Sequence, residues 1–326
     1  MEEPWSIGVD LGGTKLEVAH IDAHGRVRQR LRKATNVKGG PSAIIEDVIG
    51  YVWTLREMAD SPPVGVGVGV AGQVEKETGK VAFAPNLDWR DVPLQADLQR
   101  SIDLPVVVTN DVRAATWGEW LHGSGQGCDD LLCMFVGTGV GGGVVSGGRM
   151  LAGCNNTAGE VGHITVDMQG PLCTCGNRGC LEALAGGWAI TRLARERVAA
   201  DPVGGRLLLE MAGGGIEEIN VATVARAVRG GDPLARQLID RAADALIAGA
   251  TTLINAFNPC RLILGGGVIS GMPELVKRID KGVRGQALAA ACSSLIVLPA
   301  GLRTDAGVIG AAALAIRTFT DKGGYP

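Results

Sequence analysis

Short apolar runs rich in β-branched residues alternate along the chain with longer segments whose apolar positions recur at helical spacing. Glycine or proline bounds the apolar runs, as is typical of strands. The pattern predicts strands over residues 6–10, 16–21, 64–70, 105–109, 131–136, 143–146, 261–264 and 295–298. It predicts helices over residues 41–58, 92–100, 112–122, 188–199, 221–229, 232–257, 273–281 and 306–319. Strands that alternate with helices of this length favour a mostly parallel α/β fold.

One strand-and-turn pattern occurs twice. Residues 7–25, IGVDLGGTKLEVAHIDAHG, and residues 133–150, CMFVGTGVGGGVVSGGRM, both run from an apolar strand through a Gly/Thr turn into a second strand. We therefore predict a duplicated fold with a cleft between two lobes. The expected small lobe spans residues 1–111, with residues 305–326 packing back on it, and the expected large lobe spans residues 112–304.

The composition narrows the class of protein. The chain has 326 residues, long enough for two domains, and a formal net charge of −3. It lacks the clustered Lys and Arg that neutralise phosphates, so we expect no nucleic-acid partner. No apolar run reaches membrane-spanning length, and the N-terminus does not read as a signal peptide. These features predict a soluble cytoplasmic protein.

Two glycine-rich turns are candidate phosphate sites. Their backbone N–H groups can point at an anion, and threonine and lysine add a hydroxyl donor and a charge. The candidate contacts are Gly12, Gly13, Thr14 and Lys15 in the first turn and Gly137, Thr138 and Gly139 in the second. Asp10, at the end of a strand, is placed to hold Mg²⁺ or its waters. An ordinary hairpin turn is the alternative for DLGGTK alone, and a second such turn favours two loops that clamp a polyphosphate.

A third glycine run, Gly265, Gly266 and Gly267, ends the buried strand RLILGGG and is consistent with an adenosine resting on the backbone. A tight strand-to-helix turn explains it as well. The G-x-G-x-x-G matches at 137–142 and 67–72 do not run from a strand into a helix, as a dinucleotide fold requires. A nicotinamide oxidoreductase is therefore not expected.

Asn110 and Asp111 stand at the carboxyl end of a predicted strand, just before a helix. Ligands bind at this edge of open α/β sheets. The functional interpretation is a carboxylate that accepts the proton of a substrate hydroxyl, which Asn110 orients. The alternative is that Asp111 caps the helix that follows.

Three cysteines and a histidine lie close together in GEVGHITVDMQGPLCTCGNRGCLEAL. Cys173, Cys175, Cys180 and His163 are the ligand types of a closed tetrahedral Zn²⁺ site. Such a site has no open position for water, which favours a structural metal. Gly176 and Gly179 would provide the turns of this knuckle.

Two carboxylates flank the predicted metal site. Glu160 lies near His163, and Glu182 follows Cys180 by two residues. An imidazole fixed by a metal can donate its second N–H to a ligand. Carboxylates held beside it suit adjacent hydroxyl groups, as on a sugar.

Taken together, these motifs closely resemble the ROK family of sugar kinases, in the branch of ATP-dependent glucokinases and N-acetylhexosamine kinases. The resemblance runs through DLGGTK, APN (84–86), TND (109–111), GTGVGGG, GEVGH…CTCGNRGCLE and LGGG (264–267), in family order. It covers nearly the whole chain, and the zinc motif is its most specific part.

The resemblance implies an actin-like (ribonuclease H-like), duplicated fold of two lobes that closes around a sugar and Mg-ATP. It implies that Asp111 is the base that takes the proton of the C6 hydroxyl. The implied sugar ligands are Asn86, Asn110, Asp111, Glu160, His163 and Glu182, with Gly72 at the pocket wall. The implied cofactors are structural Zn²⁺ and Mg²⁺ with ATP, and the implied assembly is a homodimer or tetramer.

Glucose, giving glucose 6-phosphate, is the expected sugar. NDVRAATWGEW also resembles the corresponding helix of N-acetylmannosamine kinases, so an N-acetylmannosamine or N-acetylglucosamine kinase is the alternative. The family also includes sugar-responsive repressors, which carry a helix-turn-helix domain ahead of the kinase-like part. Only a few residues precede the first predicted strand here, so a sugar-binding regulatory protein is less favoured.

Overall fold

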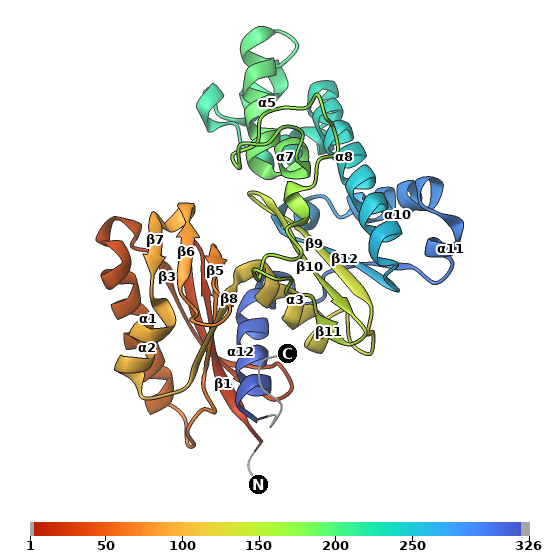
Figure 1. Ribbon diagram of the computed structural model, residues 1–326. Helices are drawn as coiled ribbons and strands as arrows, with labels where there is room; N and C mark the ends of the chain where they lie inside the picture. The colour runs from red at the N-terminus through yellow and green to blue at the C-terminus, as the bar shows by residue number, and fades with distance from the viewer. Residues whose placement is uncertain (1–2, 321–326) are drawn as a thin grey trace. The chain divides into compact units, whose positions relative to one another are not determined.

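The computed structural model describes residues 3–320 (Figure 1). By internal contacts the chain divides into two units, which are described separately below. The first unit comprises the described residues up to 129, residues 143–158 and those from 301 onward; the second comprises residues 130–142 and 159–300. The lobe boundary expected between residues 111 and 112 falls inside the first unit, and the extent of the functional lobes stays a prediction.

The first unit is built on a five-stranded sheet and a three-stranded sheet. Its strands are β1 (Trp5–Leu11), β2 (Lys15–Asp22), β3 (Val27–Ala34), β4 (Val66–Val70), β5 (Gln73–Val74), β6 (Val81–Ala84), β7 (Trp89–Val92), β8 (Val106–Asn110) and β11 (Arg149–Met150). Its helices are α1 (Gly40–Glu57), α2 (Leu94–Ile102), α3 (Asp111–His122) and α12 (Ala306–Thr320).

The five-stranded sheet has the order β3-β2-β1-β4-β8. β1, β2 and β3 are antiparallel, whereas β1, β4 and β8 are parallel. In the register of the parallel strands, Leu11 lies beside Val70 and Val70 beside Asn110. The first glycine turn and the Asn110–Asp111 pair therefore both follow the carboxyl ends of parallel strands, on the same side of the sheet.

Helices cover both faces of this sheet (Figure 1). The apolar sides of α1 and α2 pack against β1 and β4 on one face, in a core that includes Ile44, Leu98 and Val68. On the other face α12 packs against β2. A side chain at Gly8 or Gly67 would collide with the backbone of α12, so these glycines allow the helix to lie close to the sheet. Gly67, in one of the rejected G-x-G-x-x-G matches, thus has a packing role.

The sheet on which the second unit is built has an arrangement like that of the five-stranded sheet in the first unit. Its strands are β9 (Leu131–Val136), β10 (Val140–Ser146, which the unit division cuts after residue 142), β12 (Arg261–Gly265) and β13 (Ile296–Pro299). Its helices are α4 (Leu181–Ala185), α5 (Gly187–Ala200), α6 (Arg206–Met211), α7 (Val221–Arg229), α8 (Pro233–Phe257), α9 (Gly267–Gly271), α10 (Glu274–Gln286) and α11 (Ala289–Cys292).

The second sheet has the order β11-β10-β9-β12-β13, with β12 parallel to both β9 and β13. In each sheet, the three strands on one side follow one another in the chain, and the strands on the other side are parallel. This confirms the duplicated α/β fold that the sequence predicts. No helix of the described residues 3–320 is long and apolar enough to cross a membrane.

Candidate functional site

The first glycine turn joins β1 to β2 and is closed by its own backbone. The Gly12 N–H donates to the Lys15 carbonyl at 3.0 Å, so this amide is used within the turn. Thr35, the residue after β3, supports the turn, since its hydroxyl donates to the Gly12 carbonyl at 2.7 Å. Gly13 lies directly against the backbone of Asn86, where a side chain on Gly13 would collide.

A cluster of charges lies beneath this turn. The Lys15 ammonium lies 3.6 Å from the carboxylate of Asp10 and 2.6 Å from that of Glu17. Glu17 is fully buried and also pairs with Arg30 at 3.1 Å and Arg32 at 2.9 Å. One buried carboxylate therefore holds three cations, and the sequence analysis missed it because Glu17 reads as an ordinary polar residue of β2.

Asp10 is the second-last residue of β1, next to the turn. Burial raises the pKa of Asp10, and the nearby Lys15 opposes that rise. Gly307, in the first turn of α12, lies close to this carboxylate, and the N-terminus of a helix favours negative charge. A divalent cation would favour the ionised form further.

Asn110 connects three parts of the first unit. Its side-chain oxygen accepts the N–H groups of Val112 and Arg113, which makes Asn110 the N-cap of α3. Its amide group donates to the Gly72 carbonyl at 3.2 Å and to the Asp111 carboxylate at 3.0 Å. The alternative in which Asp111 itself is the cap is wrong, because Asn110 holds that position and Asp111 is the first helical residue.

The second glycine turn joins β9 to β10 and is tied to the start of α5. The N–H groups of Gly187 and Trp188 donate to the carbonyls of Gly137 and Thr138, each at 2.9 Å. The first residues of α5 therefore hold the backbone of the turn.

The third glycine run forms the strand-to-helix turn considered for it, and the contact with an adenosine stays a prediction. Gly265 packs against the ring of Phe135, and Gly266 has a φ of 89° and lies against the backbone of Val136. A strand-to-helix turn is thus present, and it leads directly into α9. A side chain at Gly267 would meet open space, and Gly267 lines a cavity.

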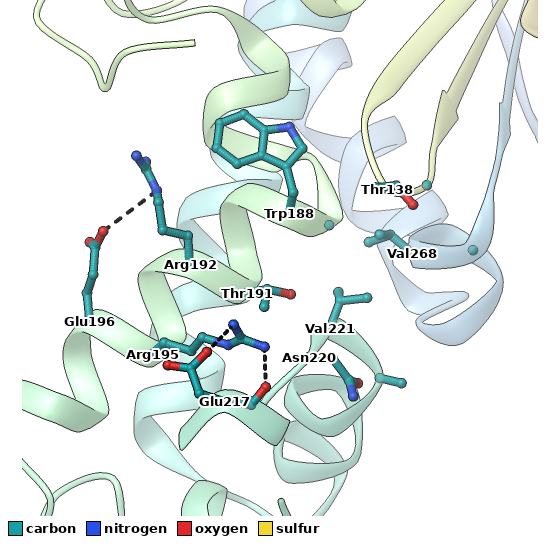
Figure 2. A pocket seen from close by; sticks show the side chains of 14 residues that line it. Thr138, Trp188, Thr191, Arg192, Arg195, Glu196, Glu217, Asn220, Val221 and Val268 are labelled. Atoms are coloured by element: carbon teal, nitrogen blue, oxygen red, sulfur yellow. Dashed lines mark hydrogen bonds and ion pairs between the residues drawn. The ribbon is translucent and has the colours of Figure 1, made fainter. Parts of the chain in front are cut away.

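This cavity has a volume of about 940 Å³ and lies wholly within the second unit (Figure 2). The second glycine turn and the residues around Gly267 form one side, and α5 and α7 form the other. Arg195 lines the cavity and pairs with Glu217 at 2.8 Å. The lining residues that the sequence analysis missed include Trp188, Thr191, Arg195 and Asn220. The first three come from α5, whose pattern indicated only a helix, and Asn220 is the N-cap of α7.

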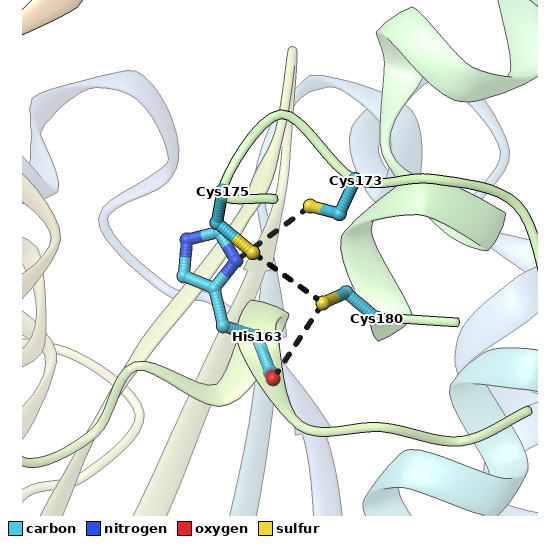
Figure 3. A group of neighbouring side chains, drawn as sticks. All are labelled: His163, Cys173, Cys175 and Cys180. Carbon is cyan, nitrogen blue, oxygen red and sulfur yellow. Dashed lines mark hydrogen bonds between the residues drawn. The ribbon is translucent and has the colours of Figure 1, made fainter. Parts of the chain in front are cut away.

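The four predicted metal ligands lie together (Figure 3). The ligand atoms of His163, Cys173, Cys175 and Cys180 all lie within 4.8 Å of one another. The Cys173 sulfur is 3.8 Å from Nδ1 of His163, and the Cys175 sulfur is 3.7 Å from that of Cys180. Burial and the neighbouring sulfurs raise the pKa of Cys180 to about 12. These four protein ligands would fill every position of a tetrahedral Zn²⁺ and so fit a structural zinc site.

The predicted turns of the knuckle (residues 163–180) are present. Gly176 and Gly179 have φ values of 91° and 68°, which favour glycine. A side chain at Gly179 would also collide with the backbone of Asp167.

The flanking carboxylates differ in their surroundings. Glu160 is exposed just before the short helical turn that contains His163. Glu182 lies in α4, and its carboxylate accepts the Val140 N–H at 2.9 Å and the Trp188 indole N–H at 3.3 Å.

The predicted site residues fall into two sets, one in each unit. The first unit holds Asp10, Gly12, Gly13, Thr14, Lys15, Gly72, Asn86, Asn110 and Asp111. The second unit holds Gly137, Thr138, Gly139, Glu160, His163, Cys173, Cys175, Cys180, Glu182, Gly265, Gly266 and Gly267. Their individual roles stay predictions.

Comparisons with known proteins agree over nearly the whole chain. A family model described as the ROK family matches residues 6–318. A glucokinase of Halalkalibacterium halodurans is 35% identical over 314 residues, which cover 95% of this chain and 94% of that protein. An N-acetylmannosamine kinase of Escherichia fergusonii is 34% identical over 312 residues, which cover 95% of this chain and 98% of that protein.

A solved structure supports the same relationship. The crystal structure of a ROK family glucokinase from Streptomyces griseus, in complex with glucose and AMPPNP, matches with a TM-score of 0.83 at 37% identity. The match covers 96% of this chain and 99% of that one.

Proposed function

Since the chain belongs to the ROK family, we propose that it is an ATP-dependent sugar kinase that phosphorylates the 6-hydroxyl of a hexose, with glucose as the preferred sugar. The observation that carries this proposal is the cavity beside the second glycine turn. Its volume of about 940 Å³ suits a nucleotide-sized ligand, and its glycine-rich side lets a ligand approach the backbone.

In this proposal the nucleoside of ATP occupies that cavity. The Trp188 ring and the backbone at Gly267 offer it apolar contact, and Asn220 offers a polar one. The phosphates bind at the two glycine turns. Mg²⁺ accompanies ATP and neutralises phosphate charge, and Asp10 is the residue that would hold it or its waters.

Asp111 is proposed as the base that accepts the proton of the C6 hydroxyl. Asn110 donates to its carboxylate at 3.0 Å and so fixes its orientation. The acceptor hydroxyl, once positioned, needs only this proton acceptor and an aligned donor, because phosphoryl transfer depends mainly on positioning and charge stabilisation.

The remaining predicted sugar ligands are assigned by the family pattern. They are Gly72, Asn86, Asn110, Glu160, His163 and Glu182. Zinc bound by His163 and the three cysteines would order the segment that carries Glu160 and Glu182. It would act as a structural ion, because protein ligands fill all four of its positions.

The identity of the sugar depends on the relatives. Glucokinases and an N-acetylmannosamine kinase match this chain at nearly equal identity. The structure that is bound to glucose and AMPPNP favours glucose and ATP. A homo-oligomer and a cytoplasmic location, in keeping with an intracellular donor such as ATP, complete the proposal.

Mg-ATP-dependent release of ADP tests the proposal. The zinc-replete protein would be assayed with glucose, mannose, fructose, N-acetylglucosamine and N-acetylmannosamine. We expect the highest kcat/KM with glucose. Preference for N-acetylmannosamine would transfer the assignment to the alternative kinase, and folded protein that turns over none of the five would contradict it.

A further inference from the structure

Glu182 is engaged by the second glycine turn. One carboxylate oxygen accepts the Val140 N–H at 2.9 Å, at the point where the turn enters β10. The same oxygen lies against Gly139, where any side chain would collide with it. A hydrogen bond from a backbone N–H to a carboxylate is among the stronger kinds in proteins. The side chain of Glu182 therefore helps to set the position of this turn.

The second carboxylate oxygen fixes Glu182 from the opposite direction. It accepts the indole N–H of Trp188 at 3.3 Å. Trp188 lines the cavity, and its own backbone N–H donates to Thr138 in the turn. Glu182, Trp188 and the turn thus form one hydrogen-bonded unit beside the cavity.

The metal knuckle adjoins this unit. Cys180 is the N-cap residue of α4, and Glu182 lies in the first turn of that helix. Cys173, Cys180 and Ala183 form one buried cluster, against which Trp188 packs. The segment that holds the glycine turn is therefore anchored at the knuckle by both backbone and packing.

We propose that Glu182 is a positioning residue for the phosphoryl donor, and that α4 transmits the order of the metal knuckle to the second glycine turn. This inference rests on the proposed function, which assigns donor phosphates to that turn. A carboxylate has more acceptor sites than these two bonds use, so Glu182 can still accept a sugar hydroxyl. Glu182 therefore has a second role besides sugar binding, and loss of this role is expected to raise the KM for ATP.

Replacement Glu182→Gln tests it. The amide keeps the shape of the side chain, but its NH₂ group cannot accept a bond, so either Val140 or Trp188 loses its acceptor. We expect the KM for ATP to rise about tenfold, the loss typical of a hydrogen bond to a charged group, with a smaller rise in the KM for glucose. Zinc content should stay unchanged.

Glu160→Gln is the matched control. It removes the charge of the other carboxylate that flanks the knuckle, and we expect the opposite result, a raised KM for glucose with the KM for ATP unchanged. A Glu182→Gln enzyme with a raised KM for glucose and an unchanged KM for ATP would overturn the inference and leave Glu182 as a sugar ligand only.

Titration calorimetry with Mg-AMPPNP, without sugar, separates this inference from the proposed function. We expect Glu182→Gln to weaken AMPPNP binding about tenfold. If the wild-type protein binds AMPPNP but turns over no sugar, the proposed function fails and the titration still tests Glu182. If Glu182→Gln loses zinc, Glu182→Asp, which keeps the charge but shortens the reach, is titrated instead. Unchanged binding by the zinc-replete variant contradicts the inference.

Discussion

At the scale of the residue, Asn110 and Asp111 divide two roles between neighbouring positions. Asn110 caps α3 and holds the Gly72 carbonyl, so the helix does not depend on Asp111 for its start. We expect Asp111→Asn to lower kcat by about 10²–10⁴, the usual contribution of a general base, with little change in the KM for ATP. Steady-state kinetics measures this, with the exposed Asp60→Asn as the control. An Asp111→Asn enzyme with wild-type kcat would remove Asp111 from the mechanism.

Glu17 gives a second prediction at this scale. Its fully buried carboxylate is the shared partner of Lys15, Arg30 and Arg32. Breaking a buried ion pair on one side costs about 3–5 kcal/mol, and the partial exposure of these cations reduces that cost, so we expect Glu17→Gln to lose about 2–3 kcal/mol of unfolding free energy. Urea denaturation measures it.

The control for Glu17 is Asp47→Asn, which breaks the surface pair of Asp47 with Lys33 at 2.7 Å. We expect this variant to be nearly neutral, as surface pairs usually are. Equal losses of unfolding free energy in the two variants would contradict the prediction that the buried pairs of Glu17 contribute more than a surface pair.

At the scale of the element, the knuckle brings the four proposed zinc ligands together. We expect the purified protein to carry about one zinc ion per chain, since three thiolates and an imidazole form a complete structural site. Cys175→Ser should lose the metal and lower the thermal midpoint, whereas Cys260→Ser, at another exposed cysteine, should do neither. Metal analysis and thermal scans measure both. Zinc retention by Cys175→Ser, with an unchanged midpoint, would contradict the assignment.

The elements also show how far the sequence predicts the structure. Apolar runs such as 131–136, and amphipathic segments such as 221–229, were placed correctly because burial imposes their period. β3, VRQRLRKA, was missed because its polar pattern is not that of a half-buried strand. It forms at a sheet edge, where Arg30 and Arg32 pair with buried Glu17. No local sequence pattern predicts an ion-pair partner of this kind.

The candidate site, too, was predicted from the sequence only in part. Ligand spacing predicted the knuckle, and glycine with threonine predicted the turns. The wall of the cavity was not predictable, because Trp188 and Asn220 come together only when α5 and α7 pack. The contact of Glu182 with Val140 joins residues that lie 42 positions apart, which is beyond the reach of a local motif.

At the scale of the whole molecule, two half-buried histidines, His20 and His122, predict how stability varies with pH. Burial is the largest cause that lowers the pKa of His20, which stacks on Trp5, and that of His122. The unfolded chain therefore binds more protons than the fold, and stability is lost as pH falls below about 6.5 toward the lowered values.

Thermal scans between pH 8 and pH 5 measure this loss. We expect His20→Gln to reduce the fall in the thermal midpoint, and His24→Gln, at a histidine whose side chain is 57% exposed, to leave it unchanged. An equal fall in all three proteins would show that His20 does not contribute.

The duplicated fold, the cavity and the family relationship converge on one reaction, the transfer of a phosphoryl group from ATP to O6 of glucose. The most direct measurement is ³¹P NMR of the protein incubated with Mg-ATP and glucose. We expect the ATP signals to be replaced by those of ADP and glucose 6-phosphate. Phosphorylation at another hydroxyl, or ATP that stays intact in the presence of folded, zinc-replete protein, would contradict it.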